Sequence, residues 1–129
     1  MNGEDDMRRV ADGDGLGRLG PDVLRRLLEA TVAVTFGLAP GELVAPTRRT
    51  APIAFARQVA IYSAHTVAGL SLNRAGRLFG RDRTTAAHAC RVVEDRRDDP
   101  EVERRVAAVE AALRGWAHTS RGPCGEAAR

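Results

Sequence analysis

The sequence contains no lysine, and its 20 basic residues are all arginines. A Walker A phosphate loop requires a lysine, so the chain is not a conventional P-loop ATPase. Aromatic residues make up only 4% of the 129 residues, which indicates a core of leucine, valine and alanine, as in packed helices. No apolar run approaches the roughly 18 residues of a membrane span, so we expect no membrane association.

Cysteine is also scarce. Cys90 and Cys124 do not have the spacing of metal ligands, and we predict two free thiols in a reducing compartment. The first residues, with Glu4, Asp5 and Asp6, are unlike a secretory signal. Because the sequence shows no nucleophile–base pair, no metal cluster and no phosphate loop, we expect no enzyme activity, no metal, no cofactor and no bound nucleotide.

Positive charge is concentrated in the middle of the chain. Residues 48–97 hold ten arginines and three acidic residues, a net charge of +7, whereas the whole chain carries +3. A basic middle between acidic flanks is typical of a phosphate-binding surface. A solvated arginine-rich face has the same composition, so charge alone leaves both interpretations open.

The apolar pattern predicts an all-α fold: a compact bundle of about five helices with a central helix-turn-helix, over residues 21–116. Residues 1–20 are predicted to be a flexible acidic arm, and residues 117–129 a flexible tail. Three further helices are predicted from Pro21 to near Gly37, from Pro52 to about Val67, and from Pro100 to Trp116. The expected inward faces are Val23, Leu24, Leu27, Leu28, Thr31 and Val32; Ile53, Ala56, Ala60, Ile61 and Ala64; and Val102, Val106, Val109, Leu113 and Trp116.

The helix-turn-helix is predicted between residues 71 and 97. Ser71 is a good N-cap for a short helix that ends at Phe79, and Gly80 begins the turn. The second helix runs from about Arg83 to Arg97 and buries Ala86, Ala89 or Cys90, and Val93. Its first turn gathers the polar side chains of Asp82, Arg83, Thr84 and Thr85. A helix that reads DNA needs such groups there, because base edges in the major groove are recognised by hydrogen bonds.

Three motifs resemble the C-terminal DNA-binding domain of the bacterial replication initiator DnaA: residues 56–62 (ARQVAIY), 70–72 (LSL) and 79–91 (FGRDRTTAAHACR). The resemblance implies that bases are read by Arg49, which enters the minor groove from a basic loop, and by Asp82, Arg83, Thr84 and Thr85 in the major groove. It implies that the DNA backbone is contacted by Arg48, Arg57, Gln58, His65, Ser71 and His88. Backbone contacts fix register without reading sequence.

The chain departs from the DnaA pattern in the turn and the reading helix. The turn has one glycine, Gly80, where the family usually has two, which could shift the start of the reading helix by a fraction of a turn. Arg83 stands where DnaA has a histidine, and a charged fork in place of an imidazole should alter sequence preference.

Several of these residues also fit a purely structural role. Asp82 fits an N-cap, Thr84 and Thr85 fit an ordinary first turn, and His88 fits an exposed surface position. Downstream arginines are expected to be solvated or to contact phosphate without specificity: Arg91, Arg96 and Arg97. Tyr62 and Trp116 are expected in the core, and Leu113 with Trp116 could instead form a partner surface.

The resemblance implies a cytoplasmic, nucleoid-associated protein that binds double-stranded DNA by sequence and regulates transcription. Proteins of this kind include activators of phage-derived gene-transfer-agent clusters. One alternative is a replication-control protein that competes for DnaA boxes. Another is a helical adaptor that binds RNA polymerase, another regulator or a nucleoid protein.

Overall fold

A computed structural model describes residues 15–39, 41–43 and 51–127, with side chains as far as Ala117. Over these residues the chain forms a single 3-10 turn, η1, and five α-helices, and it contains no strand. The prediction of an all-α bundle with a central helix-turn-helix is therefore confirmed. The elements are η1 (Gly15–Arg18), α2 (Pro21–Phe36), α3 (Ala51–Thr66), α4 (Leu72–Leu78), α5 (Arg83–Arg96) and α6 (Pro100–Ala127).

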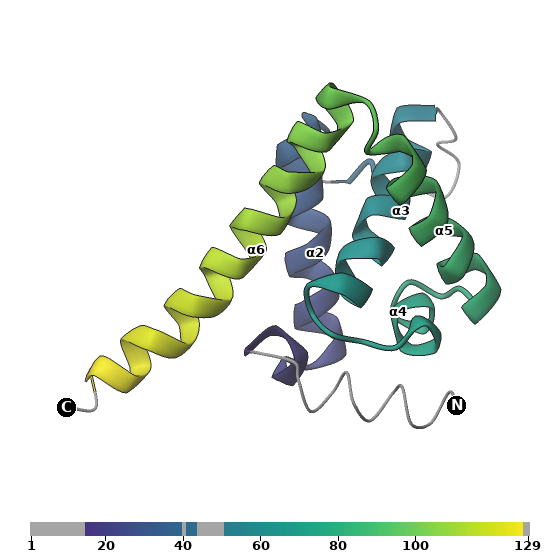
Figure 1. Cartoon of the computed structure of the whole chain (residues 1–129). Coiled ribbons are helices and arrows are strands. Elements are labelled where there is room, and N and C mark those ends of the chain that lie inside the picture. The colour runs from purple at the N-terminus through teal and green to yellow at the C-terminus, as the bar shows by residue number, and fades with distance from the viewer. Residues whose placement is uncertain (1–14, 40, 44–50, 128–129) are drawn as a thin grey trace.

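Helix α3 lies at the centre of the bundle, where it contacts α2, α4, α5 and α6. Helix α4 packs against α5, and α6 runs along α2 and touches η1 (Figure 1). Buried apolar residues lie on almost every side of α3, as expected of a helix enclosed by others. All its predicted core residues are buried: Ile53, Ala56, Ala60, Ile61 and Ala64.

The helix ends follow the capping residues of the sequence. Pro21 opens α2, which ends at Gly37 in the left-handed conformation, with φ of 69°. The Ser71 hydroxyl accepts a hydrogen bond from the Arg74 amide at 3.2 Å and so caps α4. The Asp99 carboxylate accepts from the Glu101 amide at 2.9 Å at the start of α6. These contacts confirm the predicted helix starts.

The turn between α4 and α5 requires glycine at one position, and a second glycine supports it from α4. Gly80 has φ of 72°, which disfavours other residues, whereas Phe79 has φ of −108° and needs no glycine. A Cβ on Gly76 would lie 2.6 Å from the Asp82 carbonyl oxygen, so Gly76 allows α4 to approach the turn. The Arg81 amide closes this contact by donating to the Gly76 carbonyl at 2.8 Å.

Three apolar predictions at the edges of the bundle are wrong. Val23 is 54% exposed, and Leu16, expected in the flexible arm, is fully buried. Trp116 is 37% exposed, and Ala117 is buried in its place. The apolar stripe of α6 steps four residues from Leu113 to Ala117. The helix continues past the predicted end, to Ala127. Contact between η1 and α6 extends the core beyond both predicted boundaries.

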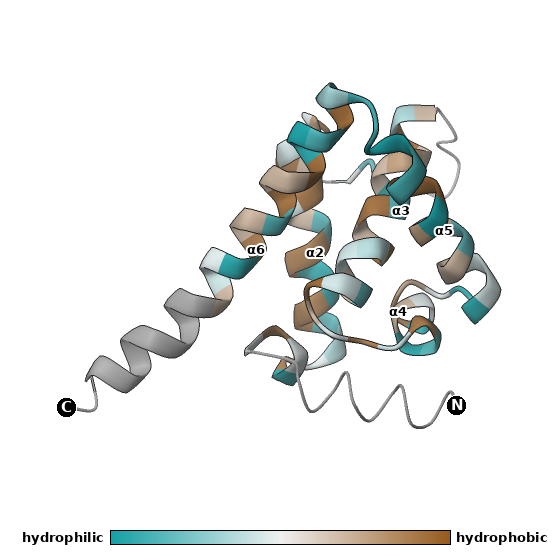
Figure 2. Ribbon diagram, viewed as in Figure 1, coloured by the Kyte–Doolittle hydropathy of each residue, from teal (hydrophilic) through white to brown (hydrophobic). Residues whose placement is uncertain are grey.

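Arg97 joins the end of α5 to α3 and α6, which corrects the expectation of a solvated or phosphate-binding arginine. Its guanidinium donates to Glu103 at 2.5 and 3.0 Å, to Glu110 at 2.9 and 3.2 Å, and to the Tyr62 hydroxyl at 3.1 Å. These bonds, that to Glu103 first, raise the pKa of Arg97 above its ordinary value. We call these four residues the Arg97 clamp. Arg97 directly follows α5, at the start of the connection to α6, and this connection is hydrophilic (Figure 2).

Arg96 also packs against the bundle, through an aromatic ring of α3. Its guanidinium lies over the Phe55 ring, 4.1 Å from the centroid, and Phe55 makes an edge-to-face contact with Phe36 at 6.0 Å. Arg105 lies over the other ring, Phe36, at 5.7 Å. This stack ties α5, α3, α2 and α6 together, so Arg96 too stabilises the bundle.

Candidate nucleic-acid interface

The first turn of α5 presents polar side chains above a buried apolar face. Asp82, Arg83 and Thr84 are exposed and Thr85 is half-buried. On the opposite side of the helix Ala86, Ala89 and Val93 are buried against the bundle, as predicted. The helix therefore sits on the core and offers its N-terminus to a ligand, which is the geometry with which recognition helices enter a major groove.

Asp82 is the N-cap of α5. Its Oδ1 accepts a hydrogen bond from the Thr85 amide at 2.8 Å. The hydrogen bonds from Thr85, that of the backbone amide first, lower the pKa of the Asp82 carboxyl below its ordinary value. Asp82 therefore caps α5, the structural role that the sequence also allowed. Base reading would be a second role of the same side chain.

We expect two substitutions of Asp82 to separate these roles. Asp82→Asn keeps a good capping side chain, so the melting temperature should stay close to that of the wild type while base discrimination changes. Asp82→Ala should lower the melting temperature as well. Because the folded-state pKa is depressed, the contribution of the cap is present above the unfolded-state pKa and is lost as pH falls through the folded-state value. Circular-dichroism melts and binding to single-base-pair variants measure both effects; equal discrimination by wild type and Asp82→Asn would exclude base reading.

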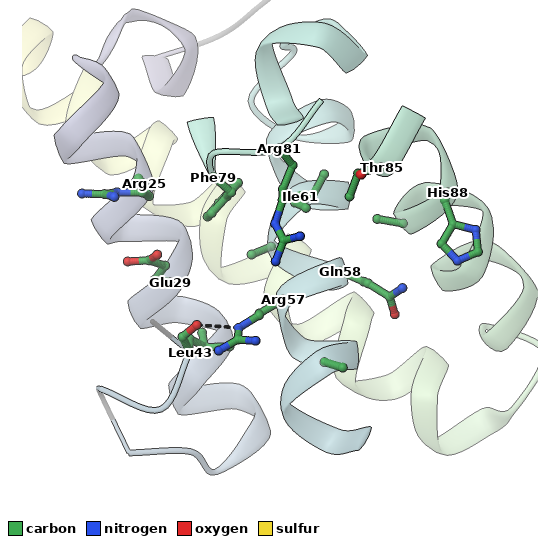
Figure 3. A pocket seen from close by; sticks show the side chains of 13 residues that line it. Arg25, Glu29, Leu43, Arg57, Gln58, Ile61, Phe79, Arg81, Thr85 and His88 are labelled. Atoms are coloured by element: carbon green, nitrogen blue, oxygen red, sulfur yellow. Dashed lines mark hydrogen bonds between the residues drawn. The ribbon is translucent and has the colours of Figure 1, made fainter. Parts of the chain in front are cut away.

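A cleft of about 710 Å³ opens beside this turn, between α2, α3, α5 and the α4–α5 connection. It brings together four of the predicted contact residues: Arg57, Gln58, Thr85 and His88. Figure 3 shows Arg57 and Gln58 on α3, with Arg81 reaching over the same helix from the turn. Arg81, Arg25 and Glu29 also line the cleft and were not predicted as contacts.

Arg57 also holds Leu43, a few residues before the arginines of the predicted basic loop. Its Nε donates to the Leu43 carbonyl at 2.6 Å, which ties α3 to the chain just before that loop (Figure 3). The loop arginines Arg48 and Arg49 lie outside the described residues. Their predicted contacts with backbone and minor groove therefore stay predictions.

His65 and Ser71 lie at the α3–α4 connection and are not among the residues that line the cleft. The His65 Nδ1 is 2.7 Å from the Leu70 carbonyl, which only accepts, so this nitrogen carries the hydrogen. Ser71 is 4% exposed and its hydroxyl caps α4. Both side chains hold the connection in place, and their contact with DNA stays a prediction.

The structure offers no competing metal site or membrane span in the parts it describes. Over residues 15–39, 41–43 and 51–127, no three histidine, cysteine or acidic side chains gather to hold a metal ion. No described helix is both long enough and apolar enough to cross a membrane.

The first turn of α5 is polar, a tight glycine turn joins this helix to α4, and a cleft lined by arginines lies beside it. Together these features define a helix-turn-helix DNA-binding domain. A family model, described as the bacterial DnaA protein helix-turn-helix, matches residues 26–93, just over half of the chain. The chain belongs to this family.

Similar proteins include chromosomal replication initiator proteins DnaA from several bacteria. That of Laribacter hongkongensis is 41% identical over 69 residues, which cover 52% of this chain and 14% of that protein. That of Herminiimonas arsenicoxydans is 37% identical over 90 residues, 68% of this chain and 19% of that protein. That of Rhodopseudomonas palustris is 41% identical over 68 residues, which cover 52% of this chain and 14% of that protein. The chain thus spans less than a fifth of the length of these relatives.

Proposed function

We propose that this chain binds double-stranded DNA by sequence and regulates transcription, with α5 in the major groove and Arg49 in the minor groove. The observation that carries the proposal is the exposed set Asp82, Arg83 and Thr84, held on a helix whose other face is buried. Hydrogen-bonding groups fixed in this way read base edges. Arginines of the cleft supply the sequence-independent attraction to phosphate.

Selection of binding sites from random duplexes tests the proposal. A recovered consensus, bound well above random DNA at about 150 mM salt, is the expected result. Equal affinity for every duplex would overturn sequence-specific binding. Genome-wide binding centred on a few promoters, such as those of phage-like gene clusters, would support a regulator of transcription.

A replication-control role is the second candidate, because this chain keeps the Asp82, Thr84 and Thr85 side chains that the DnaA resemblance places at the bases. In that role the protein would compete with DnaA for its boxes. Binding peaks that coincide with the replication origin, and displacement of DnaA from a box-containing duplex, would favour this candidate over the first.

We expect Arg57→Ala to weaken binding to every duplex by a similar factor, because a phosphate contact carries no sequence information. The slope of log affinity against log salt should become shallower by about 1. Titrations between about 50 and 200 mM salt measure it. Arg57→Lys is the control, since it keeps the charge and should restore most of the slope. An unchanged slope in Arg57→Ala, with a wild-type melting temperature, would exclude the phosphate contact.

A further inference from the structure

Glu29 is the only acidic side chain among the described residues that line the cleft. Its neighbours there are basic or neutral, with Arg25 one turn earlier on α2, Arg57 on α3, and Arg81 from the turn (Figure 3). A carboxylate in a cleft that faces phosphates is unfavourable for binding, because like charges repel. Its presence there needs an explanation that the contacts described so far do not give.

Internal pairing does not explain Glu29. Among the described residues, no hydrogen bond or ion pair holds its carboxylate. Arg25, one turn earlier on the same helix, instead pairs with Asp22 at 3.8 Å, and the Arg25 Nε is buried without a hydrogen-bond partner. Burial raises the pKa of the Glu29 carboxyl, and the charge of Arg25 opposes this shift. Glu29 is thus a half-buried carboxylate that no hydrogen bond or ion pair within the described residues neutralises.

We propose that Glu29 limits the affinity of this interface for the DNA backbone, an inference that rests on the proposed DNA-binding function. The carboxylate of Glu29 would repel phosphates that approach Arg57 and Arg81. This repulsion weakens binding by the same amount for every DNA sequence. The carboxylate therefore lowers binding to all duplexes together. Stable occupancy then depends on the base contacts of α5, because backbone attraction alone is too weak.

The test compares Glu29→Gln with Asp98→Asn in the full chain. Both changes remove one negative charge, but Asp98 is exposed in the α5–α6 connection and does not line the cleft. Fluorescence anisotropy with a random-sequence duplex and with a selected duplex measures dissociation constants. Glu29→Gln should tighten both by about threefold to tenfold, while Asp98→Asn changes them less than about twofold. The ratio of the two constants should stay constant, and melting temperatures should show that both variants fold.

Two results would overturn the inference, and they are distinguishable. If the wild type prefers the selected duplex and Glu29→Gln binds like the wild type or like Asp98→Asn, Glu29 does not limit affinity, and the proposed function stands. If no variant, including the wild type, binds any duplex, the proposed function fails and the inference fails with it.

Discussion

Arg97→Ala should unfold the bundle at a markedly lower temperature than any surface substitution in this chain. The change removes the hydrogen bonds that join α5 to α6 and α3, and it leaves the carboxylate of Glu110, whose side chain is 14% exposed, without its cation. Hydrogen bonds to charged groups contribute about 1.5–3 kcal/mol, and an unpaired, mostly buried charge adds to the loss. We expect a loss of about 3 kcal/mol in the free energy of unfolding, measured by urea titration.

Two control variants separate the geometry of the clamp from its charge. Arg104→Ala removes an exposed arginine of α6 that pairs with Glu101 at 3.2 Å, and it should cost less than about 1 kcal/mol. Arg97→Lys keeps the charge but cannot form paired bonds to two carboxylates, so it should fall between wild type and alanine. If Arg97→Ala were no more destabilising than Arg104→Ala, the clamp would not hold the helices together.

The pH dependence of stability gives the clamp a second signature. The side-chain bond from Arg97 lowers the pKa of the Glu103 carboxyl. A depressed folded-state pKa contributes stability that is present above the unfolded-state pKa and lost as pH falls through the folded-state value. Acid should therefore destabilise the wild type more than Arg97→Ala, which has already lost this contact. If the free energy of unfolding fell equally with decreasing pH in the wild type and in Arg97→Ala, the role of Glu103 would be contradicted.

Local sequence signals predicted the helix-turn-helix because they act over a few residues. Ser71 and Asp82 cap the helices they precede, and Gly80 supplies the left-handed turn. The single buried face of α5 follows from helical spacing, which the sequence shows directly. The residues that meet in the cleft, such as Arg57 and Thr85, were predicted through the motifs that surround them.

The clamp could not be predicted because its partners are far apart in sequence. Arg97 bonds to Tyr62, 35 residues before it, and to Glu110, 13 residues after it. Nothing in the sequence distinguishes it from its exposed neighbour Arg96 before the helices are placed. The continuation of α6 past Trp116 has a similar cause, because burial of Ala117 beside η1 is a tertiary contact. Glu29 escaped notice because α2 carried no motif that pointed to a ligand.

Arg83→Ala should relax base discrimination, whereas loss of a phosphate contact weakens all duplexes alike. Arg83 is the first residue of α5 and is exposed, and no hydrogen bond or ion pair within the described residues holds its guanidinium. A guanidinium placed there can donate two hydrogen bonds to a guanine edge, and such a pair contributes about 1–3 kcal/mol of discrimination. We expect affinity for the selected duplex to fall by that amount, about 1–3 kcal/mol, and affinity for random DNA to change little.

The comparison with Arg91→Ala decides whether Arg83 reads bases. Arg91 is an exposed arginine of the same helix, two turns further from the N-terminus, so its loss should weaken every duplex alike. Arg83→His supplies the histidine that the DnaA resemblance places at this position and should move the selected consensus towards the sequence that DnaA prefers. Binding to duplexes with each base pair changed in turn measures both effects. If Arg83→Ala weakened binding to every duplex equally, as expected for Arg91→Ala, Arg83 would be a phosphate contact. Asp82 and Thr84 would then be the residues that read the bases.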